Sequence, residues 1–278
     1  GAGVNNIPLD RAAEAGIVVF NTPGANANGV KELTIAALLL ASRKISQGIT
    51  WVKEQAAAGA DVAAVVEKGK AAYVGPEIQG KTLGVVGLGA IGVLVANAAA
   101  ALGMQIVGYD PFLSVQHALN LTPGVKVVST LEELYGQADY ISLHLPMTPE
   151  TKGTLNDAAF AAMKDGVVLV NAARGGIFNM DALADFVAAG KIAAVAVDSF
   201  EAEPCTDSPL HEFENAILTP HLSPMTHEAQ RRASTQIAEY VEAGLEGGMV
   251  ATAVNLSPLP PEVFDAIGPY VHACKMMG

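Results

Sequence analysis

Residues 83–92 read Leu-Gly-Val-Val-Gly-Leu-Gly-Ala-Ile-Gly, and this stretch decides the fold. The apolar run Leu83–Val86 predicts a buried strand, which leads directly into a G-x-G-x-x-G turn formed by Gly87, Gly89 and Gly92. Alone, such a motif is weak, because an ordinary glycine-rich turn has the same spacing. Here it follows a strand and opens a helix, whose first N–H groups would be free to bind phosphate.

A carboxylate in the right place strengthens this interpretation. Asp110 ends the next predicted strand, 18 residues beyond Gly92. Gly87 permits the tight turn, Gly89 lets the backbone approach a pyrophosphate, and Gly92 lets helix and strand pack closely. Asp110 would accept hydrogen bonds from ribose hydroxyls and repel a 2′-phosphate. The sequence therefore predicts a dinucleotide site, with NAD favoured over NADP.

Short apolar runs alternate with helical stretches from residue 81 onward, which predicts an α/β fold with a doubly wound parallel sheet of the Rossmann type. The predicted strands are Leu83–Val86, Gln105–Tyr109, Val125–Val128, Tyr140–Leu143, Val167–Val170, Ala193–Val197 and Ala216–Leu218. The predicted helices lie near Ile91–Leu102, Leu131–Gln137, Ala158–Met163 and Asp181–Ala189.

The flanks differ in character from this block. The first residues predict a turn, a short helix over Leu9–Ala15 and a strand over Ile17–Phe20. A long apolar helix over Val30–Lys44 precedes a more polar, glycine-punctuated segment, and a second long helix is expected from Thr226 to Gly247. One short helix at most is expected after it. The predicted domains are residues 1–24, a dinucleotide-binding domain over 25–225, and residues 226–278.

Composition excludes several functional classes. With 51% hydrophobic and 16% charged residues the chain is not of the disordered type, and its net charge of −12 argues against a nucleic-acid surface. No apolar stretch approaches the roughly 18 residues of a membrane span. Cys205 and Cys274 have no metal-ligand spacing, so we expect no metal and a reducing, cytoplasmic location.

Three successive strands end in chemically useful groups. Arg174 follows one strand, Glu203 the next, and His221 the third. Each alone would more often be a solvated loop residue, but the carboxyl ends of parallel strands share one edge of a sheet. Together they suit oxidation of a secondary alcohol: His221 takes the hydroxyl proton, Glu203 holds the imidazole, and Arg174 orients a carboxylate. His144, also at a strand end, could face the cofactor.

Seven motifs in order resemble the D-isomer-specific 2-hydroxyacid dehydrogenases over nearly the whole chain. They are Gly1-Ala-Gly-Val-Asn-Asn6, Gly87–Gly92, Tyr109-Asp110-Pro111, His144-Leu-Pro-Met-Thr-Pro149, Asn171–Gly176, Asp198–Pro204 and Thr219-Pro220-His221. The resemblance implies Arg174, Glu203 and His221 as catalytic residues, and Ala2, Gly3 and Arg174 as substrate-binding ones. It implies that NAD is bound by Gly87, Gly89, Ala90, Ile91, Gly92, Asp110, Leu145, Ala172, Ala173, Arg174, Asp198, His221, Leu222, Ser223 and Pro224. Pro224 departs from the family's small residues and lacks a backbone donor.

The resemblance also implies a substrate and an organisation. It implies remnants of a flavodoxin-like substrate domain at both ends, and hydride transfer between NAD and a D-2-hydroxy acid. The expected substrate pair is 3-phospho-D-glycerate and 3-phosphohydroxypyruvate, as in L-serine biosynthesis. Glycerate or another 2-hydroxy acid is the alternative, and so is a non-catalytic NAD(H)-binding module or fragment. Apolar surface on Val30–Lys44 and the segment to Gly80 predicts a homodimer or a higher homo-oligomer.

Overall fold

The computed structural model describes residues 1–4, 6–246, 248, 250, 252–256, 263, 267 and 270. Its internal contacts divide the chain into two compact units. The larger comprises Ala27–Met225, and the smaller joins Gly1–Asn26 to Thr226–Gly278.

The larger unit is built on a seven-stranded sheet in which every neighbouring pair is parallel. The strand order is β3-β2-β1-β4-β5-β6-β7. The strands are β1 (Thr82–Val86), β2 (Gln105–Tyr109), β3 (Lys126–Val127), β4 (Tyr140–Leu143), β5 (Val167–Asn171), β6 (Ile192–Val197) and β7 (Ala216–Leu218). The order reverses between β1 and β4, which makes this the switch point where ligands of such sheets bind. The predicted doubly wound α/β fold is confirmed.

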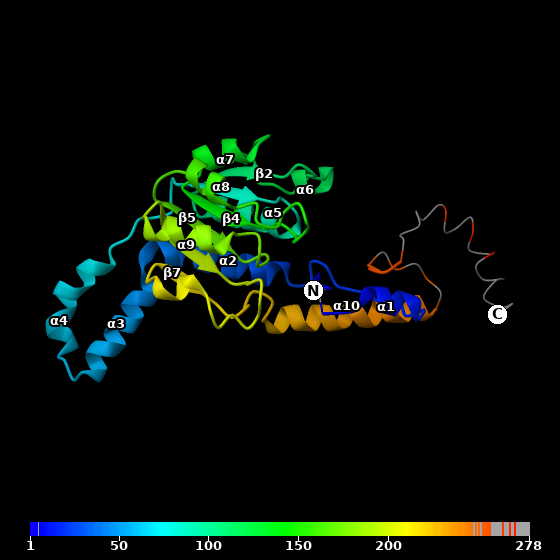
Figure 1. Ribbon diagram of the computed structural model, residues 1–278, viewed down its shortest axis with the longest axis horizontal. Coiled ribbons are helices and arrows are strands. Elements are labelled where there is room, and N and C mark those ends of the chain that lie inside the picture. The colour runs from blue at the N-terminus through cyan, green and yellow to red at the C-terminus, as the bar shows by residue number, and fades with distance from the viewer. Residues whose placement is uncertain are drawn as a thin grey trace. The chain divides into compact units, whose positions relative to one another are not determined.

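Helices cover both faces of the sheet (Figure 1). On one face, α2 (Ala27–Arg43) and α5 (Ala90–Ala101) pack over a core that includes Leu38, Leu83 and Val85. The other face is covered by α7 (Leu131–Gln137), α8 (Asp157–Ala162) and α9 (Met180–Ala188). Both cores are made almost wholly of Val, Leu, Ile and Ala, because strands buried on both faces need apolar side chains in every position.

Local signals fix where these helices begin. Thr130 Oγ1 caps α7 by accepting from Glu133 N at 3.2 Å, and the Glu133 carboxylate accepts in turn from Ser129 N at 3.2 Å. Strand β3 is shorter than the predicted Val125–Val128 because this edge strand pairs only with Val107 and Gly108 of β2. The small elements α6 (Val115–Leu119) and η2 (Pro209–Glu212) complete the unit.

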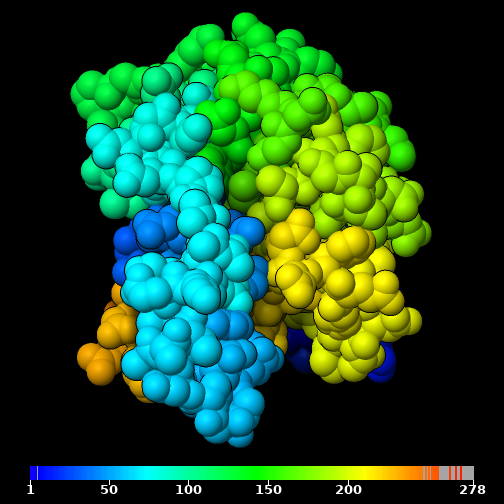
Figure 2. Space-filling model, turned by 90° about the vertical axis from the view of Figure 1, so that its left-hand side faces the viewer, coloured from blue at the N-terminus to red at the C-terminus, as the bar shows by residue number. Residues whose placement is uncertain are grey.

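An arm of three short elements extends from this unit beside α2 (Figure 1) and faces the viewer in Figure 2. It comprises α3 (Ile45–Ala57), α4 (Val62–Gly69) and η1 (Lys70–Tyr73), and none of its residues is buried. Trp51 and Tyr73 meet with ring centroids 5.8 Å apart and hold α3 to η1. These helices were not predicted from the sequence, because the segment is comparatively polar and is interrupted by Gly48, Gly59 and Gly69.

The smaller unit contains α1 (Leu9–Glu14) and the long α10 (His227–Leu245). Thr226 Oγ1 caps α10 by accepting from Ala229 N at 3.0 Å, as predicted. The predicted strand over Ile17–Phe20 is wrong: it is reduced to one bridge, Phe20 with Ala253, and Ile17 is 59% exposed. Val254 N donates to Val19 O at 2.9 Å and Asn21 N to Thr252 O at 3.3 Å, but among the described residues these bonds do not extend into a ladder. The short helix predicted near the end lies outside the described residues.

Candidate functional site

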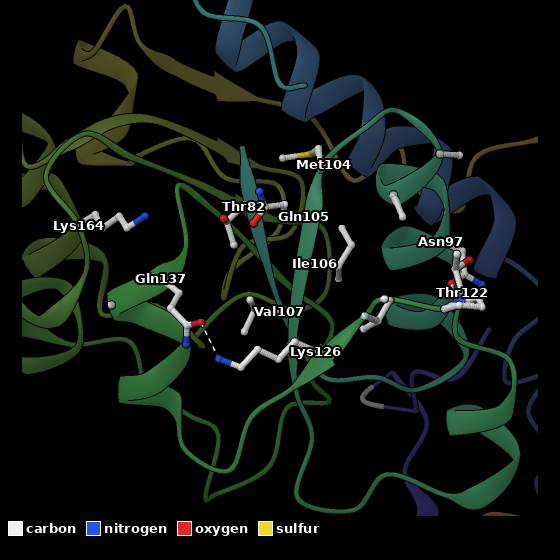
Figure 3. A pocket seen from close by; sticks show the side chains of 16 residues that line it. Thr82, Asn97, Met104, Gln105, Ile106, Val107, Thr122, Lys126, Gln137 and Lys164 are labelled. Atoms are coloured by element: carbon white, nitrogen blue, oxygen red, sulfur yellow. Dashed lines mark hydrogen bonds between the residues drawn. The ribbon is translucent and has the colours of Figure 1, made fainter. Parts of the chain in front are cut away.

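One pocket of the larger unit lies at the edge of the sheet opposite to the one where a dinucleotide binds. It measures about 780 Å³ and is lined by Thr82 and Gln105, the first residues of β1 and β2 (Figure 3). Lys126 donates to Gln137 Oε1 at 2.8 Å on its floor. Ligands of parallel sheets bind beyond the opposite, carboxyl ends of the strands, and the predicted site residues follow those ends.

Of the three glycines in the turn after β1, the structure itself requires two, Gly87 and Gly92, and leaves open space at Gly89. Gly87 has φ +92°, and a Cβ there would lie 2.7 Å from the carbonyl oxygen of His144. A Cβ on Gly92 would overlap the carbonyl oxygen of Gly87. A Cβ on Gly89 would meet nothing within 4 Å, although Gly89 has an ordinary φ of −75°. Neither backbone strain nor packing accounts for Gly89, so this open position fits the close approach of a pyrophosphate to the start of α5.

Asp110 joins the end of β2 to this turn. Its Oδ2 accepts from Leu88 N at 2.8 Å, and its Oδ1 accepts from Phe112 N at 2.8 Å. A carboxylate has about four acceptor positions, so these two bonds leave acceptors for ribose hydroxyls. Ala90 and Ile91 form the first turn of α5 beside it, with no acidic or basic side chain in that turn. The residues present therefore fit an NAD adenosine and pyrophosphate.

Glu203 and His221 form a hydrogen-bonded pair beyond the ends of β6 and β7. Glu203 Oε2 lies 2.8 Å from His221 Nδ1, and Glu203 Oε1 accepts from Phe200 N at 2.9 Å. An ionised carboxylate can only accept, so Nδ1 carries the proton and Nε2 of the neutral ring is an acceptor. A pocket of about 300 Å³ lies against the pair, lined also by Pro204, Cys205 and His211. This arrangement can take a proton from a substrate hydroxyl.

Arg174 stands on a turn shaped by the last residue of β5. The Asn171 amide donates to Arg174 O at 2.9 Å and its Oδ1 accepts from Ala173 N at 3.1 Å. The guanidinium is half-buried, and Ala173 O is its one acceptor among the described residues, at 2.7 Å from Nη1. A Cβ on Gly175 would overlap the Phe200 backbone, so the turn that carries Arg174 lies against the loop that carries Glu203.

Asp198 organises the loop that carries His221. This carboxylate is 3% exposed, and it accepts from Leu222 N at 2.7 Å and from Ser223 N at 2.9 Å. It also accepts from the Thr219 hydroxyl at 2.7 Å. The predicted cofactor residues Leu222 and Ser223 are thereby brought to Asp198, and Pro224 follows them along the chain.

His144 and Leu145 follow β4 and lie directly against the glycine turn. A Cβ on Gly87 would lie 3.3 Å from Leu145 Cδ2. His144 Nε2 is 2.8 Å from Ser142 Oγ, and its Nδ1 is enclosed without a partner among the described residues. Burial lowers the pKa of His144 to about 3, so the ring is neutral at any physiological pH.

The remaining predicted residues are Ala172, Ala173, Ala2 and Gly3, which have no polar side-chain atoms. Ala172 and Ala173 are buried at the end of β5, between the Asn171 side chain and Arg174. Ala2 and Gly3 belong to the smaller unit, where Ala2 O accepts from Asn21 Nδ2 at 3.0 Å, and their role in substrate binding stays a prediction.

Sequence reasoning missed two residues, Asn171 and Thr219, that shape these loops. Asn171 is 1% exposed and ends an otherwise apolar strand, and that lone polar residue was the available signal. No feature of the sequence indicated the role of Thr219, because that role depends on a hydrogen bond to Asp198, which lies 21 residues away along the chain. None of the described helices is long and apolar enough to cross a membrane.

Curated proteins of one name are similar to this chain over its full length. The curated D-3-phosphoglycerate dehydrogenase of Mycobacterium tuberculosis (strain ATCC 25618 / H37Rv) is 42% identical over 278 residues, which are 100% of this chain and 50% of that protein. The protein of the same name from Methanocaldococcus jannaschii is 39% identical over 100% of this chain and 51% of its own length. The chain thus spans about half the length of these curated relatives.

Solved structures show the same architecture. The holo form of D-mandelate dehydrogenase from Rhodotorula graminis matches with a TM-score of 0.80 and 29% identity, over 94% of this chain and 74% of that one. A glyoxylate reductase from Paecilomyes thermophila matches with a TM-score of 0.76 and 33% identity, over 91% and 73%. The sequence profile of the D-isomer specific 2-hydroxyacid dehydrogenase NAD binding domain matches residues 35–223. The chain therefore belongs to the D-isomer-specific 2-hydroxyacid dehydrogenases and carries the NAD-binding domain of that family.

Proposed function

We propose that the protein catalyses hydride transfer between NAD and a D-2-hydroxy acid. The observation that carries the proposal is the 2.8 Å pair of Glu203 Oε2 and His221 Nδ1, on loops that follow β6 and β7. NAD, when bound, supplies the acceptor for hydride. The Gly87–Gly92 turn and Asp110 would hold its pyrophosphate and adenosine ribose.

The chain's own residues would divide the remaining work. His221 Nε2 takes the hydroxyl proton during oxidation and returns it during reduction, because Glu203 keeps the proton of the neutral ring on Nδ1. Arg174 carries a planar fork of donors, of which Nη1 contacts Ala173 O. The rest of the fork would hold the substrate carboxylate and polarise the carbonyl of the keto acid.

The proposed substrate is 3-phospho-D-glycerate, oxidised to 3-phosphohydroxypyruvate in L-serine biosynthesis. Its support is the name shared by relatives that match the whole chain at 37–44% identity. A cytoplasmic location belongs to this proposal, because Cys205 is a free thiol and reducing compartments keep thiols unpaired.

The test is NADH oxidation with phosphohydroxypyruvate, hydroxypyruvate and pyruvate in parallel, followed by loss of NADH absorbance. We expect turnover with the phosphorylated keto acid and at least about 100-fold less in His221→Asn, since acid–base groups contribute about 10²–10⁴-fold. Preference for hydroxypyruvate or pyruvate would move the substrate to the glycerate or lactate class. NADH binding without turnover of any keto acid would contradict the proposal for this chain.

We also propose that the arm mediates self-association into a homodimer. Ile45, Ile49 and Val52 of α3 are 42%, 51% and 41% exposed, and Val74 after η1 is 74% exposed. Apolar side chains gathered on an arm with no buried residue are typical of an interface. Light scattering should give a dimer for the unaltered chain and a monomer for Ile49→Lys. Leu119→Lys, at a site on α6 that is 79% exposed and lies outside the arm, should stay dimeric.

A further inference from the structure

The carboxylate of Asp198 is buried, and none of the described residues forms an ion pair with it. Asp198 is 3% exposed, and its carboxylate accepts hydrogen bonds from one hydroxyl and two backbone N–H groups, those of Thr219, Leu222 and Ser223. Burying a charge is costly unless it is fully hydrogen-bonded. All three donors belong to one short loop, residues 219–223. The buried charge is therefore stabilised only while that loop keeps the shape that brings the donors to it.

His221 occupies the middle of this loop in an unusual conformation. Its φ is +53°, in the left-handed region that residues with a Cβ adopt uncommonly, and its N–H closes a tight turn to Thr219 O at 2.9 Å. Such a conformation persists only where surrounding contacts over-determine it. Asp198 supplies those contacts on both sides, to Thr219 before His221 and to Leu222 and Ser223 after it.

We propose that Asp198 and the Thr219 hydroxyl form a positioning device that holds His221 in the left-handed conformation required for its Nδ1 to meet Glu203. The inference deepens the proposed function and rests on it, because it concerns how the proton-transferring ring is held. It assigns Asp198 a task separate from cofactor contact. Three of its roughly four acceptor positions are used inside the protein.

The carboxylate is required because both of its oxygens accept. Oδ1 takes Thr219 Oγ1 and Leu222 N, and Oδ2 takes Ser223 N. In Asp198→Asn the amide has the same shape, but its NH₂ would face either Ser223 N or the pair on the other side. Two donors would then oppose each other, and an unmade buried hydrogen bond is costly. Thr219→Val removes a single bond and is the milder perturbation.

The test reads the His221 ring directly and needs no turnover. Long-range ¹H–¹⁵N spectra of the labelled chain report which ring nitrogen carries the proton, with the His221 signals assigned by their loss in His221→Asn. We expect one fixed tautomer, protonated on Nδ1, in the unaltered chain. In Asp198→Asn and Thr219→Val both nitrogen shifts should move toward each other, as the ring leaves Glu203 and exchanges tautomers. Thr219→Ser should restore the fixed tautomer.

Ser199→Ala is the matched control, since this neighbouring hydroxyl is 2% exposed and has no partner among the described residues. It should keep the fixed tautomer. A fixed tautomer retained in both Asp198→Asn and Thr219→Val would overturn the inference, and if Asp198→Asn does not fold, Thr219→Val alone decides. With a keto acid that turns over, kcat should fall by up to about 100-fold in Asp198→Asn, the effect of misplacing a reacting group by about 1 Å. Absence of turnover in the unaltered chain contradicts the proposed function and leaves the ring measurement decisive.

Discussion

Adding one methyl group at Gly92 and one at Gly89 should give opposite phenotypes, although both glycines belong to the same turn. At Gly92 the new Cβ would overlap the Gly87 carbonyl oxygen and lie 3.4 Å from Val85 Cγ1. Both neighbours are parts of the strand–turn junction, so they cannot rotate away as a flexible side chain would. At Gly89 the new Cβ would meet nothing within 4 Å.

The expected magnitudes follow from these two environments. Overpacking of this kind costs up to about 3 kcal/mol, while Gly→Ala within a helix returns about 1 kcal/mol through propensity. Gly92→Ala should therefore lose about 2 kcal/mol of unfolding free energy, a fall in Tm of roughly 4–8 °C for a unit of this size. Gly89→Ala has an ordinary φ to adopt and should stay within about 0.5 kcal/mol. Its methyl would occupy the space proposed for pyrophosphate, so the Kd for NADH should rise about tenfold or more, which is about 1.4 kcal/mol.

Thermal unfolding and NADH fluorescence titration, on the same two variants, separate these effects. Gly92→Ala should melt early, and Gly89→Ala should melt normally yet bind NADH poorly. Equal Tm losses in the two variants would refute the geometric distinction. Unchanged NADH binding by Gly89→Ala would refute the placement of the pyrophosphate.

Three further outcomes are expected. Burial lowers the pKa of His144 from 6.5 to about 3, so below pH 6.5 the unfolded chain binds a proton that the native chain does not. The unfolding free energy should therefore fall by about 1.4 kcal/mol per pH unit toward pH 3. Urea titrations at pH 7 and pH 5 should show this pH dependence in the unaltered chain and its loss in His144→Asn. Asp110→Asn removes the charge and keeps an acceptor for only one of its two partners, Leu88 N or Phe112 N, so the Kd ratio of NADPH to NADH should fall by about tenfold or more. An unchanged ratio would exclude Asp110 from the ribose site. Lys152→Ala should change the unfolding free energy by less than about 1 kcal/mol, since its 2.6 Å pair with Glu201 is solvent-exposed, and a larger loss in urea titration would show a structural role.

The fold was predictable where a local signal and the global arrangement agree. The turn after β1 combines a strand, three spaced glycines and a helix start within ten residues, so neighbours in sequence are also neighbours in space. The strand predicted over Ile17–Phe20 failed because its partner, near Ala253, lies far along the chain and offers a single bridge. The arm helices α3 and α4 were missed because Gly48, Gly59 and Gly69 punctuate this segment, and glycine is unfavourable inside helices.

For the site, residue types were predictable and their hydrogen bonds were not. Arg174, Glu203 and His221 each follow a recognisable strand, and parallel strands bring their carboxyl ends to one edge. The contact of Glu203 with His221 is confirmed as geometry, and its role in proton transfer stays a prediction. Nothing in the sequence indicates that Thr219 donates to Asp198, because a threonine hydroxyl can bond to many different acceptors, including nearby backbone carbonyl groups.

The ends of β5 and β6, which precede Arg174 and Glu203, share a feature that can be recognised in a sequence. Strand β5 ends in Asn171, and β6 is followed by Asp198, each a buried polar residue after a wholly apolar run. A buried acceptor must find donors, and the nearest are the N–H groups of loops at the same edge. Asn171 binds the turn that presents Arg174, and Asp198 binds the loop that presents His221. A lone Asn or Asp at the end of a buried parallel strand therefore indicates a loop held in one shape, and the residue that this loop presents is the one to test for chemistry.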